Sequence, residues 1–304
     1  MIMLWLIIAI AAYFLLAVTN TGDKLLISHV VSDPKEYVFL VGLPLGFLVI
    51  FIPFFGWPGP RIALLALAAG FIFNYGLYWL YLSLKNFDSS QAVPAISGLV
   101  PVFTTLLSFL FLGEIINWYQ GSAIILLVLG SVLISLSSKF RLDKKALAYA
   151  AIAAFLFATA FVLSREVFRA SGSFWQALLW IKFGGFFVSL AIGAFWPQVL
   201  KGLIGRPTAN AQKGFWLYLN QFVGIIANIL QNFSIWLSSG IAIALPVINA
   251  LQGVQYIFIM LFAWILRRRF SKQMEEDFSS RALLRKISGL VLLCSGLIIF
   301  ASLT

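Results

Sequence analysis

The sequence has 304 residues, of which 62% are hydrophobic and 10% are charged, and its mean hydropathy is +1.01. This much apolar surface exceeds what the core of a soluble domain can bury, so the composition excludes a soluble protein and predicts a chain that crosses a lipid bilayer several times. The net charge of +11 does not indicate nucleic-acid binding, because the basic residues cluster between apolar segments, where they set membrane topology. The single cysteine, Cys294, can form no internal disulfide.

Charged residues and Pro/Gly pairs divide the sequence into ten apolar runs, each close to the roughly 20 residues that cross a bilayer as a helix. Helices are expected because the runs lack the alternation typical of barrel strands. The opening run has no charged leader and no small-residue cleavage site before it, so we expect a first span and not a signal peptide. The predicted spans are residues 2–20, 37–55, 62–82, 91–112, 118–137, 146–163, 174–195, 215–237, 241–266 and 283–303.

The ten runs divide into two similar halves. Residues 92–96 (AVPAI) match residues 244–248 (ALPVI) in pattern, and Phe14-Leu15-Leu16-Ala17 aligns with Phe155-Leu156-Phe157-Ala158. We therefore predict a five-helix unit at 1–138, a basic linker at 139–145 and a second unit at 146–304. Because each unit has an odd number of spans, the second is expected to be inserted upside down around a central cavity, as in many transporters.

The distribution of Lys and Arg predicts the orientation. Loops after the odd-numbered spans hold most of these residues, whereas the other side has Arg61, Arg165 and Arg169. The positive-inside rule places the basic side in the cytoplasm, so both termini are expected to lie outside it. The expected location is a prokaryotic inner or plasma membrane.

In this context the sequence resembles the drug/metabolite transporter superfamily, specifically its EamA-like ten-helix members. The residues that carry the resemblance are Pro94, Pro101, the turn Phe111-Leu112-Gly113-Glu114, and the spacing of Gly121 and Gly130, together with the five-plus-five duplication. The resemblance implies two inverted five-helix bundles around a central cavity, which exchange small metabolites by alternating access. The two halves differ at the turn, because Leu266-Arg267 stands where Gly113-Glu114 would, and we interpret Glu114 as a structural carboxylate near a helix start.

Polar side chains at helical spacing lie inside several apolar runs, where each is costly in lipid unless it faces protein or water. One interpretation is a cavity wall that hydrogen-bonds a polar solute, with Pro94 and Pro246 bending as gates. The other is interhelical packing, in which Asn and Gln bond across helices at about 1 kcal/mol each. The glycines within spans predict close helix packing or flexibility, at Gly70, Gly184, Gly185, Gly224 and Gly253. The candidate substrate-binding residues are Asn20, Asn74, Tyr78, Ser97, Lys182, Asn228, Gln231, Asn249, Gln252 and Tyr256.

Lys182 is the most informative of these residues, because it lies well inside the run at 174–195. An intramembrane cation usually faces a partner or a water-filled path, and it can bind a carboxylate or phosphate as a point charge. The alternative is that the side chain extends about 12 Å along its helix toward the outer interface.

Acidic residues are absent from the middle of the predicted spans. None lies mid-span, so a mid-membrane proton-carrying acid, as in the small multidrug resistance branch of the superfamily, is not expected. Asp23 and Glu166 lie at span ends beside Lys24 and Arg165, which predicts neutralisation at the interface.

These observations predict a secondary-active or facilitative transporter of a small polar metabolite, foremost an amino acid or a related carboxylate-bearing compound. The alternatives are an exporter of drugs or of nucleoside- and sugar-type metabolites, and an integral-membrane enzyme, for which no convergent acid, base or nucleophile set is present in the sequence. No cofactor, metal or nucleic acid is expected. The expected partners are the substrate and the bilayer, and the chain is expected to be a monomer.

Overall fold

A computed structural model describes residues 2–27, 33–86, 89–113, 117–135, 144–199, 211–266 and 279–303. The regular structure of these residues is entirely helical. In chain order the elements are α1 (Ile2–Ile27), α2 (Pro34–Gly42), the 3₁₀ helix η1 (Leu43–Phe51), α3 (Ile52–Phe55), α4 (Pro60–Asn86), α5 (Ser89–Leu112), α6 (Trp118–Ser135), α7 (Lys144–Ala170), α8 (Phe174–Phe195), α10 (Ala211–Leu237), α11 (Ala244–Ala250), α12 (Gln252–Leu266) and α13 (Ser280–Leu303).

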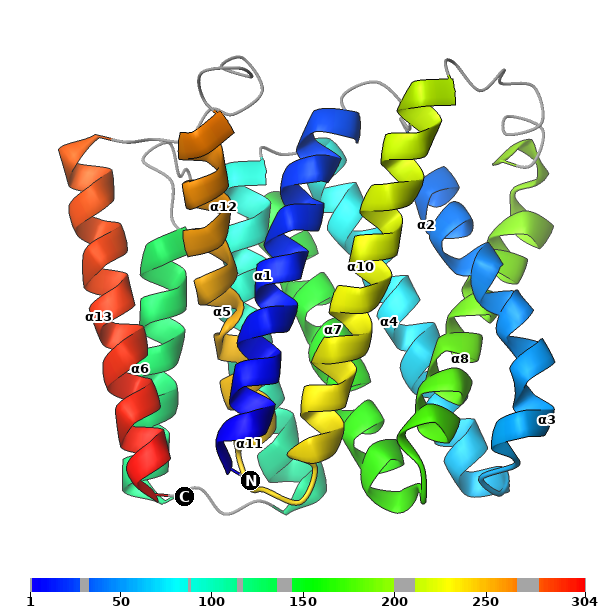
Figure 1. Cartoon of the computed structure of the whole chain (residues 1–304), viewed down its shortest axis with the longest axis horizontal. Coiled ribbons are helices and arrows are strands. Elements are labelled where there is room, and N and C mark those ends of the chain that lie inside the picture. The colour runs from blue at the N-terminus through cyan, green and yellow to red at the C-terminus, as the bar shows by residue number, and fades with distance from the viewer. Residues whose placement is uncertain are drawn as a thin grey trace.

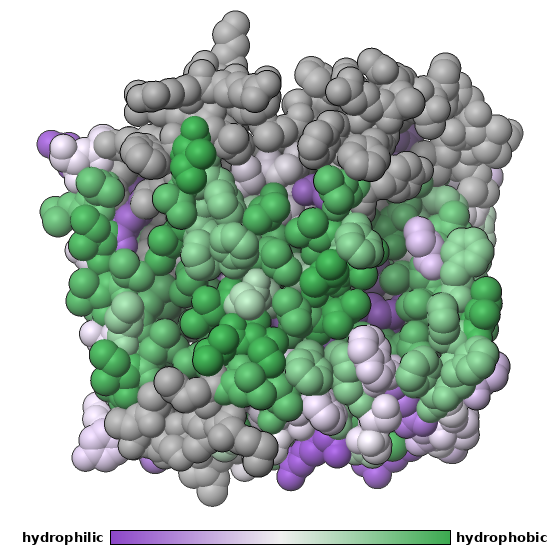
Figure 2. All heavy atoms as spheres, viewed as in Figure 1, coloured by the Kyte–Doolittle hydropathy of each residue, from purple (hydrophilic) through white to green (hydrophobic). Residues whose placement is uncertain are grey.

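Each apolar run predicted from the sequence coincides with helical structure. The helices stand side by side between two ends of the molecule, and Figure 1 shows that α1 begins and α13 ends at the same end. Figure 2 shows a broad band of hydrophobic residues across the middle of the visible face, with hydrophilic residues along its lower edge. A hydrophobic surface of this kind is suited to contact the apolar interior of a bilayer.

Among the described residues, five helical segments are long and apolar enough to cross a membrane, and four further apolar segments are shorter. This confirms the all-helical structure of the described residues, with several helices suited to span a membrane, whereas ten crossings and an inverted repeat stay predictions. The five long segments are Leu4–Gly22, Pro34–Phe55, Pro60–Ser83, Leu147–Ala170 and Phe174–Phe195.

The run predicted as one helix at 37–55 is instead interrupted. It consists of α2, the 3₁₀ helix η1 and the short α3, each with a proline at its first or second position. Pro44 has no backbone N–H to donate to the preceding turn, so the helix tightens locally where a regular α-helical bond is lost. The Ser189 hydroxyl on α8 donates to the Phe39 carbonyl at 3.1 Å and ties this irregular segment to its neighbour.

The run predicted at 241–266 is also interrupted. The helix α11 starts after Ile243, a buried non-glycine residue with a left-handed φ of 57°, and the chain breaks again at Leu251 before α12. Pro246 is the third residue of α11, where a missing N–H costs no intrahelical bond. Pro246 therefore does not cause the break at Leu251, and its predicted gating role stays a prediction.

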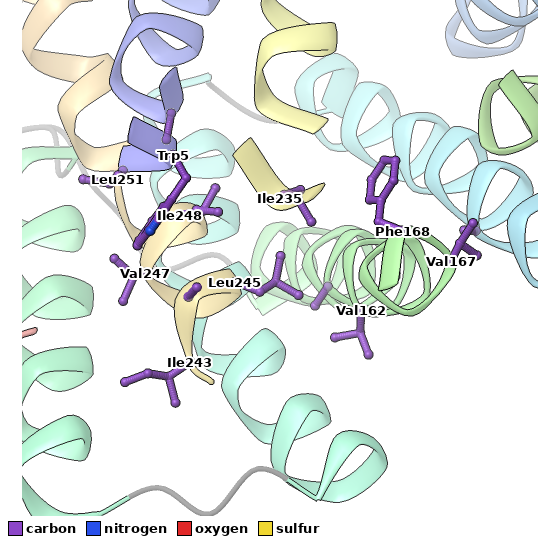
Figure 3. Packing of buried hydrophobic residues seen from close by; sticks show 14 of the residues in the cluster. Trp5, Val162, Val167, Phe168, Ile235, Ile243, Leu245, Val247, Ile248 and Leu251 are labelled. Atoms are coloured by element: carbon purple, nitrogen blue, oxygen red, sulfur yellow. The ribbon is translucent and has the colours of Figure 1, made fainter. Parts of the chain in front are cut away.

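The hydrophobic core is centred on α11, in which every residue is buried. Figure 3 shows Ile248 and Leu251 near Trp5 of α1, with Ile235 of α10 and Phe168 of α7 farther along the same cluster. Breaking a helix in the middle of this core is tolerated because packed neighbours surround it on all sides.

The most extensive helix packing joins α6 to α13, α4 to α7 and α1 to α10. Close approach in the first pair depends on glycine, since a Cβ at Gly130 would overlap the Gly289 carbonyl oxygen and one at Gly296 would overlap the Ala123 carbonyl oxygen. These two glycines therefore allow α6 and α13 to pack closely.

Candidate functional site

A small pocket surrounds Lys182 in the interior of the helical band. Four helices contribute to it, and its free volume of about 20 Å³ has room for about one water molecule. We call this site the Lys182 pocket. It is lined by Gly70, Phe73 and Asn74 of α4, Phe161 and Ser164 of α7, Ile181 and Lys182 of α8, and Asn228 and Asn232 of α10.

The Lys182 ammonium faces α10 and α4, and does not extend along its own helix to the interface. Its Nζ donates a hydrogen bond to the Asn228 side-chain oxygen and lies 5.7 Å from the centre of the Phe73 ring. Asn232 donates to the Asn228 backbone carbonyl at 2.8 Å and to the same side-chain oxygen at 3.0 Å. The Asn228 amide is thus held in place as an acceptor for the cation.

None of the residues that line the pocket carries a negative charge. A partly buried ammonium of this kind has an amide oxygen and an aromatic face to stabilise it, but no carboxylate among the described residues. Removing a charge from water costs several kcal/mol when no opposite charge compensates it. The site is therefore suited to receive an anionic group.

Asn74 also lines this pocket. Its side chain is 5% exposed, and its Nδ2 donates to the Gly70 carbonyl at 3.1 Å. Because a carbonyl only accepts, this bond identifies the other atom of the amide as oxygen. That oxygen, Oδ1, is buried without a hydrogen-bond partner in the described structure.

The pocket forms where α4 and α8 cross at very short range. A Cβ at Gly70 would overlap the Ile181 carbonyl oxygen, and one at Gly184 would overlap the Leu67 backbone. A Cβ at Gly185 would collide with the Asn74 amide. The glycines predicted to mediate close packing at 70, 184 and 185 therefore bring the Asn74 and Lys182 backbones together.

Other predicted site residues form polar contacts elsewhere in the core. The Asn249 amide donates to the Thr104 hydroxyl of α5 at 2.9 Å, and Gln231 donates to the Tyr13 hydroxyl at 3.3 Å. Both bonds join two helices, as the packing interpretation of these stripes expects. Neither residue lines the Lys182 pocket.

The remaining candidates are more scattered. Asn20 is exposed and Gln252 is partly buried at the start of α12, while Ser97 is buried on α5. Tyr78 is partly buried and stacks on Tyr75 at 6.2 Å between ring centres. The side chains of Tyr256 and Pro94 lie outside the described part of the structure.

The structure adds pocket residues that the sequence did not single out. Phe161 and Ser164 of α7, and Phe73 and Ile181 beside the predicted residues, line the pocket. Small or apolar side chains in an apolar helix give no local signal. Asn232, by contrast, follows the predicted Asn228 by four residues, so helical periodicity places it on the same face.

Arg165 has a different role from the one predicted. Its side chain is 3% exposed, and its guanidinium donates to the Ser239 carbonyl at 3.2 Å and the Ile241 carbonyl at 2.8 Å. Glu166 is instead 3.8 Å from Arg169. Thus Arg165 holds the turn between α10 and α11, and Arg169 is the cation next to Glu166. The side chains of Asp23 and Lys24 lie outside the described residues.

Comparison with known proteins gives the family of the first half of the chain. Residues 3–136 match the model of the EamA-like transporter family. The match confirms the resemblance noted in the sequence over these residues, and members of this family are membrane transporters of the drug/metabolite type.

A structural comparison extends the similarity to the whole chain. One of 16 matching solved chains, described as "Crystal structure of protein", has a TM-score of 0.63 and 14% identity, and the match covers 98% of this chain and 95% of that one. At this identity the likeness concerns the fold alone. No curated protein matches the sequence.

Proposed function

We propose that this EamA-like protein is a secondary-active or facilitative transporter of a small polar metabolite that carries a carboxylate, foremost an amino acid or a related compound. The observation that carries the proposal is Lys182, an intramembrane cation bonded to Asn228 with no carboxylate among the residues that line its pocket. A substrate carboxylate supplies the missing negative charge and takes a charge-assisted hydrogen bond.

The size of the pocket supports a mechanism of alternating access. A volume of about 20 Å³ holds about one water molecule and no metabolite. Substrate entry therefore requires the four surrounding helices to separate toward one face of the membrane.

The pairing of helices supports a transporter built from two related five-helix units. Under the division at 139–145, α1 and α4 are the first and third spans of the first unit, and α7 and α10 are those of the second. Packing α1 on α10 and α4 on α7 joins the first span of each unit to the third span of the other. A two-fold relation between inverted units produces this reciprocal pattern.

Transport by reconstituted protein tests the proposal. Uptake of labelled L-amino acids and simple carboxylates is measured in proteoliposomes for the wild type, Lys182→Gln and the control Lys145→Gln. Lys145 is an exposed lysine at the start of α7. We expect Lys182→Gln to lower uptake at least about tenfold, since a charge-assisted bond to a buried anion is worth about 1.5–3 kcal/mol, and Lys145→Gln to leave it unchanged.

Two results would contradict the proposed function. Uptake by the Lys182→Gln protein at the wild-type rate excludes Lys182 as the substrate's counter-charge. Transport confined to nucleosides, sugars or lipophilic cations replaces the carboxylate proposal with one of the other solute classes.

A further inference from the structure

The Lys182 pocket gives the ammonium polar contacts but no opposite charge. Its Nζ donates to the Asn228 side-chain oxygen and lies 5.7 Å from the centre of the Phe73 ring, and none of the described residues that line the pocket is acidic. The free volume of about 20 Å³ leaves room for about one water molecule. An ammonium packed between helices in this way is costly until an anion joins it or a proton leaves it.

We infer that Lys182 couples transport to protons, by carrying one proton with each substrate carboxylate and becoming a neutral amine when the pocket is empty. This inference rests on the proposed function, because the substrate carboxylate is the anion that pairs with Lys182. It adds the coupling ion, H⁺, which moves in the same direction as the substrate. The proton carrier is then a base within a span, in a sequence that has no acid in the middle of a predicted span.

The cycle moves one proton for each substrate molecule. On the loading side the neutral amine takes H⁺ from water, and the ammonium formed binds the carboxylate in a charge-assisted hydrogen bond. The two charges cancel while the loaded pocket changes its access from one face to the other. On the second side the carboxylate leaves, the ammonium returns H⁺ to water, and the empty pocket closes over an uncharged side chain.

The hydrogen bonds around Lys182 suit both protonation states. The Asn232 amide donates to the Asn228 backbone carbonyl at 2.8 Å and to the Asn228 side-chain oxygen at 3.0 Å. These two bonds keep the oxygen of Asn228, and not its NH₂ group, beside Nζ. A neutral amine still has N–H groups to donate, so loss of the proton does not require the bond between Lys182 and Asn228 to break.

No other titratable side chain is among the described residues that line the pocket. On α7, Arg165 bonds two backbone carbonyls of the turn after α10. On α4, Tyr78 stacks on Tyr75, and on α10 Tyr218 precedes Asn228 by about 15 Å of helix. The segments η1 and α3 contain no titratable residue, and α2 has its own in the first turn, at Lys35, Glu36 and Tyr37.

The transporter needs Lys182 to lose its proton only when it reverses its access without substrate. Exchange of substrate on one side for substrate on the other keeps an anion beside the ammonium throughout. An arginine does not lose its proton in a protein. The Lys182→Arg protein should therefore exchange substrate but fail in net uptake, a combination that a purely structural lysine would not produce.

Proteoliposomes of the full chain test this coupling. They contain the pH-sensitive dye pyranine and receive labelled L-amino acids, and succinate as a simple carboxylate, one at a time, with the membrane potential held at zero by K⁺ and valinomycin. Net uptake is measured into empty vesicles, and exchange into vesicles preloaded with the same unlabelled compound. The wild type, Lys182→Arg and Lys182→Gln are compared with the control Lys145→Arg, which changes an exposed lysine.

We expect the wild type to acidify the vesicle interior by about one proton per molecule taken up. Making the interior one pH unit more alkaline should raise accumulation about tenfold, because one pH unit is a tenfold difference in proton concentration. Lys182→Arg should keep exchange within about twofold of the wild type and lower net uptake at least about tenfold. Lys145→Arg should behave as the wild type does.

Other results separate this inference from the proposed function. Wild-type uptake that moves no protons, or net uptake by Lys182→Arg that still moves them, overturns the proton-carrying role and leaves the carboxylate site intact. If Lys182→Arg fails to fold, the residual uptake by Lys182→Gln decides, since a response of that uptake to the pH gradient overturns the inference. Absence of wild-type uptake of every compound tested overturns the proposed function and the inference with it.

Discussion

Arg165 and Arg169 lie one turn apart on α7 in very different surroundings. The Arg165 guanidinium is buried and bonds two backbone carbonyls of the turn after α10, whereas the Arg169 side chain is 61% exposed beside Glu166. A planar guanidinium bonds two acceptors at once, which an ammonium does with poorer geometry. Two arginines of one helix thus have a structural and a surface role.

Replacing Arg165 by Leu should destabilise the protein by about 3 kcal/mol or more, since two buried carbonyls lose charge-assisted donors. Arg169→Leu is the matched control, and it should cost less than about 1 kcal/mol because exposed ion pairs contribute little. The measurement is the free energy of unfolding in mixed detergent micelles. Equal effects of the two substitutions would contradict the proposed role of Arg165 in holding the turn.

The Lys182 pocket depends on the close crossing of helices α4 and α8. Gly70 on one helix and Gly184 on the other each face backbone atoms of the partner. Within membranes, small residues allow this approach because van der Waals packing replaces the hydrophobic effect between helices. The distance between Asn74 and Lys182 therefore depends on residues that carry no functional group.

Gly70→Ala should push α4 away from α8, because the added methyl group overlaps the Ile181 carbonyl oxygen. Overpacking of this kind costs about 1–3 kcal/mol, and a displaced Asn74 should reduce substrate affinity as well. Melting temperature and uptake in proteoliposomes are the two measurements. The control is Gly172→Ala, because a Cβ at Gly172 has no neighbour within 4 Å. If Gly70→Ala matches this control in both assays, the close crossing is not required.

The interrupted helices are the second feature at the scale of elements. The α11–α12 segment breaks at Leu251, and the α2–η1–α3 segment tightens after Pro44. Broken helices leave backbone groups that neighbours must satisfy, so they occur where protein surrounds them. The buried position of α11 meets this condition.

At the scale of the whole molecule, the two chain ends share one side of the helical band. α1 begins and α13 ends at the same end in Figure 1, and the basic loops predicted from the sequence follow the odd-numbered runs. The positive-inside rule then orients the entire molecule.

Reporter fusions test this orientation. A reporter that is active only in the cytoplasm should be inactive at either terminus and active when inserted at 139–145, because the basic linker is held on the cytoplasmic side. A reporter active only outside the cytoplasm should give the reverse pattern. Cytoplasmic activity at both termini would invert the predicted topology.

The sequence by itself determined the class of the molecule and most of its helices. Hydropathy located every helical run, because a lipid-exposed backbone must bond internally and a helix is the local solution. It also singled out Lys182, Asn74 and Asn228, since polar groups in apolar helices are costly and therefore conspicuous. The sequence did not predict the interruptions at Pro44 and Leu251, because element boundaries are the least reliable part of a prediction from sequence.

Only the tertiary structure decided which polar residues meet. Lys182, Asn228 and Asn74 converge on one pocket, whereas Asn249 and Gln231 bond Thr104 and Tyr13 elsewhere. The stripes of these helices look alike in sequence, because periodicity gives a face and not the neighbour opposite it. That neighbour depends on close contacts such as Gly70 against Ile181, which join residues far apart in the chain and are settled by packing of the whole bundle.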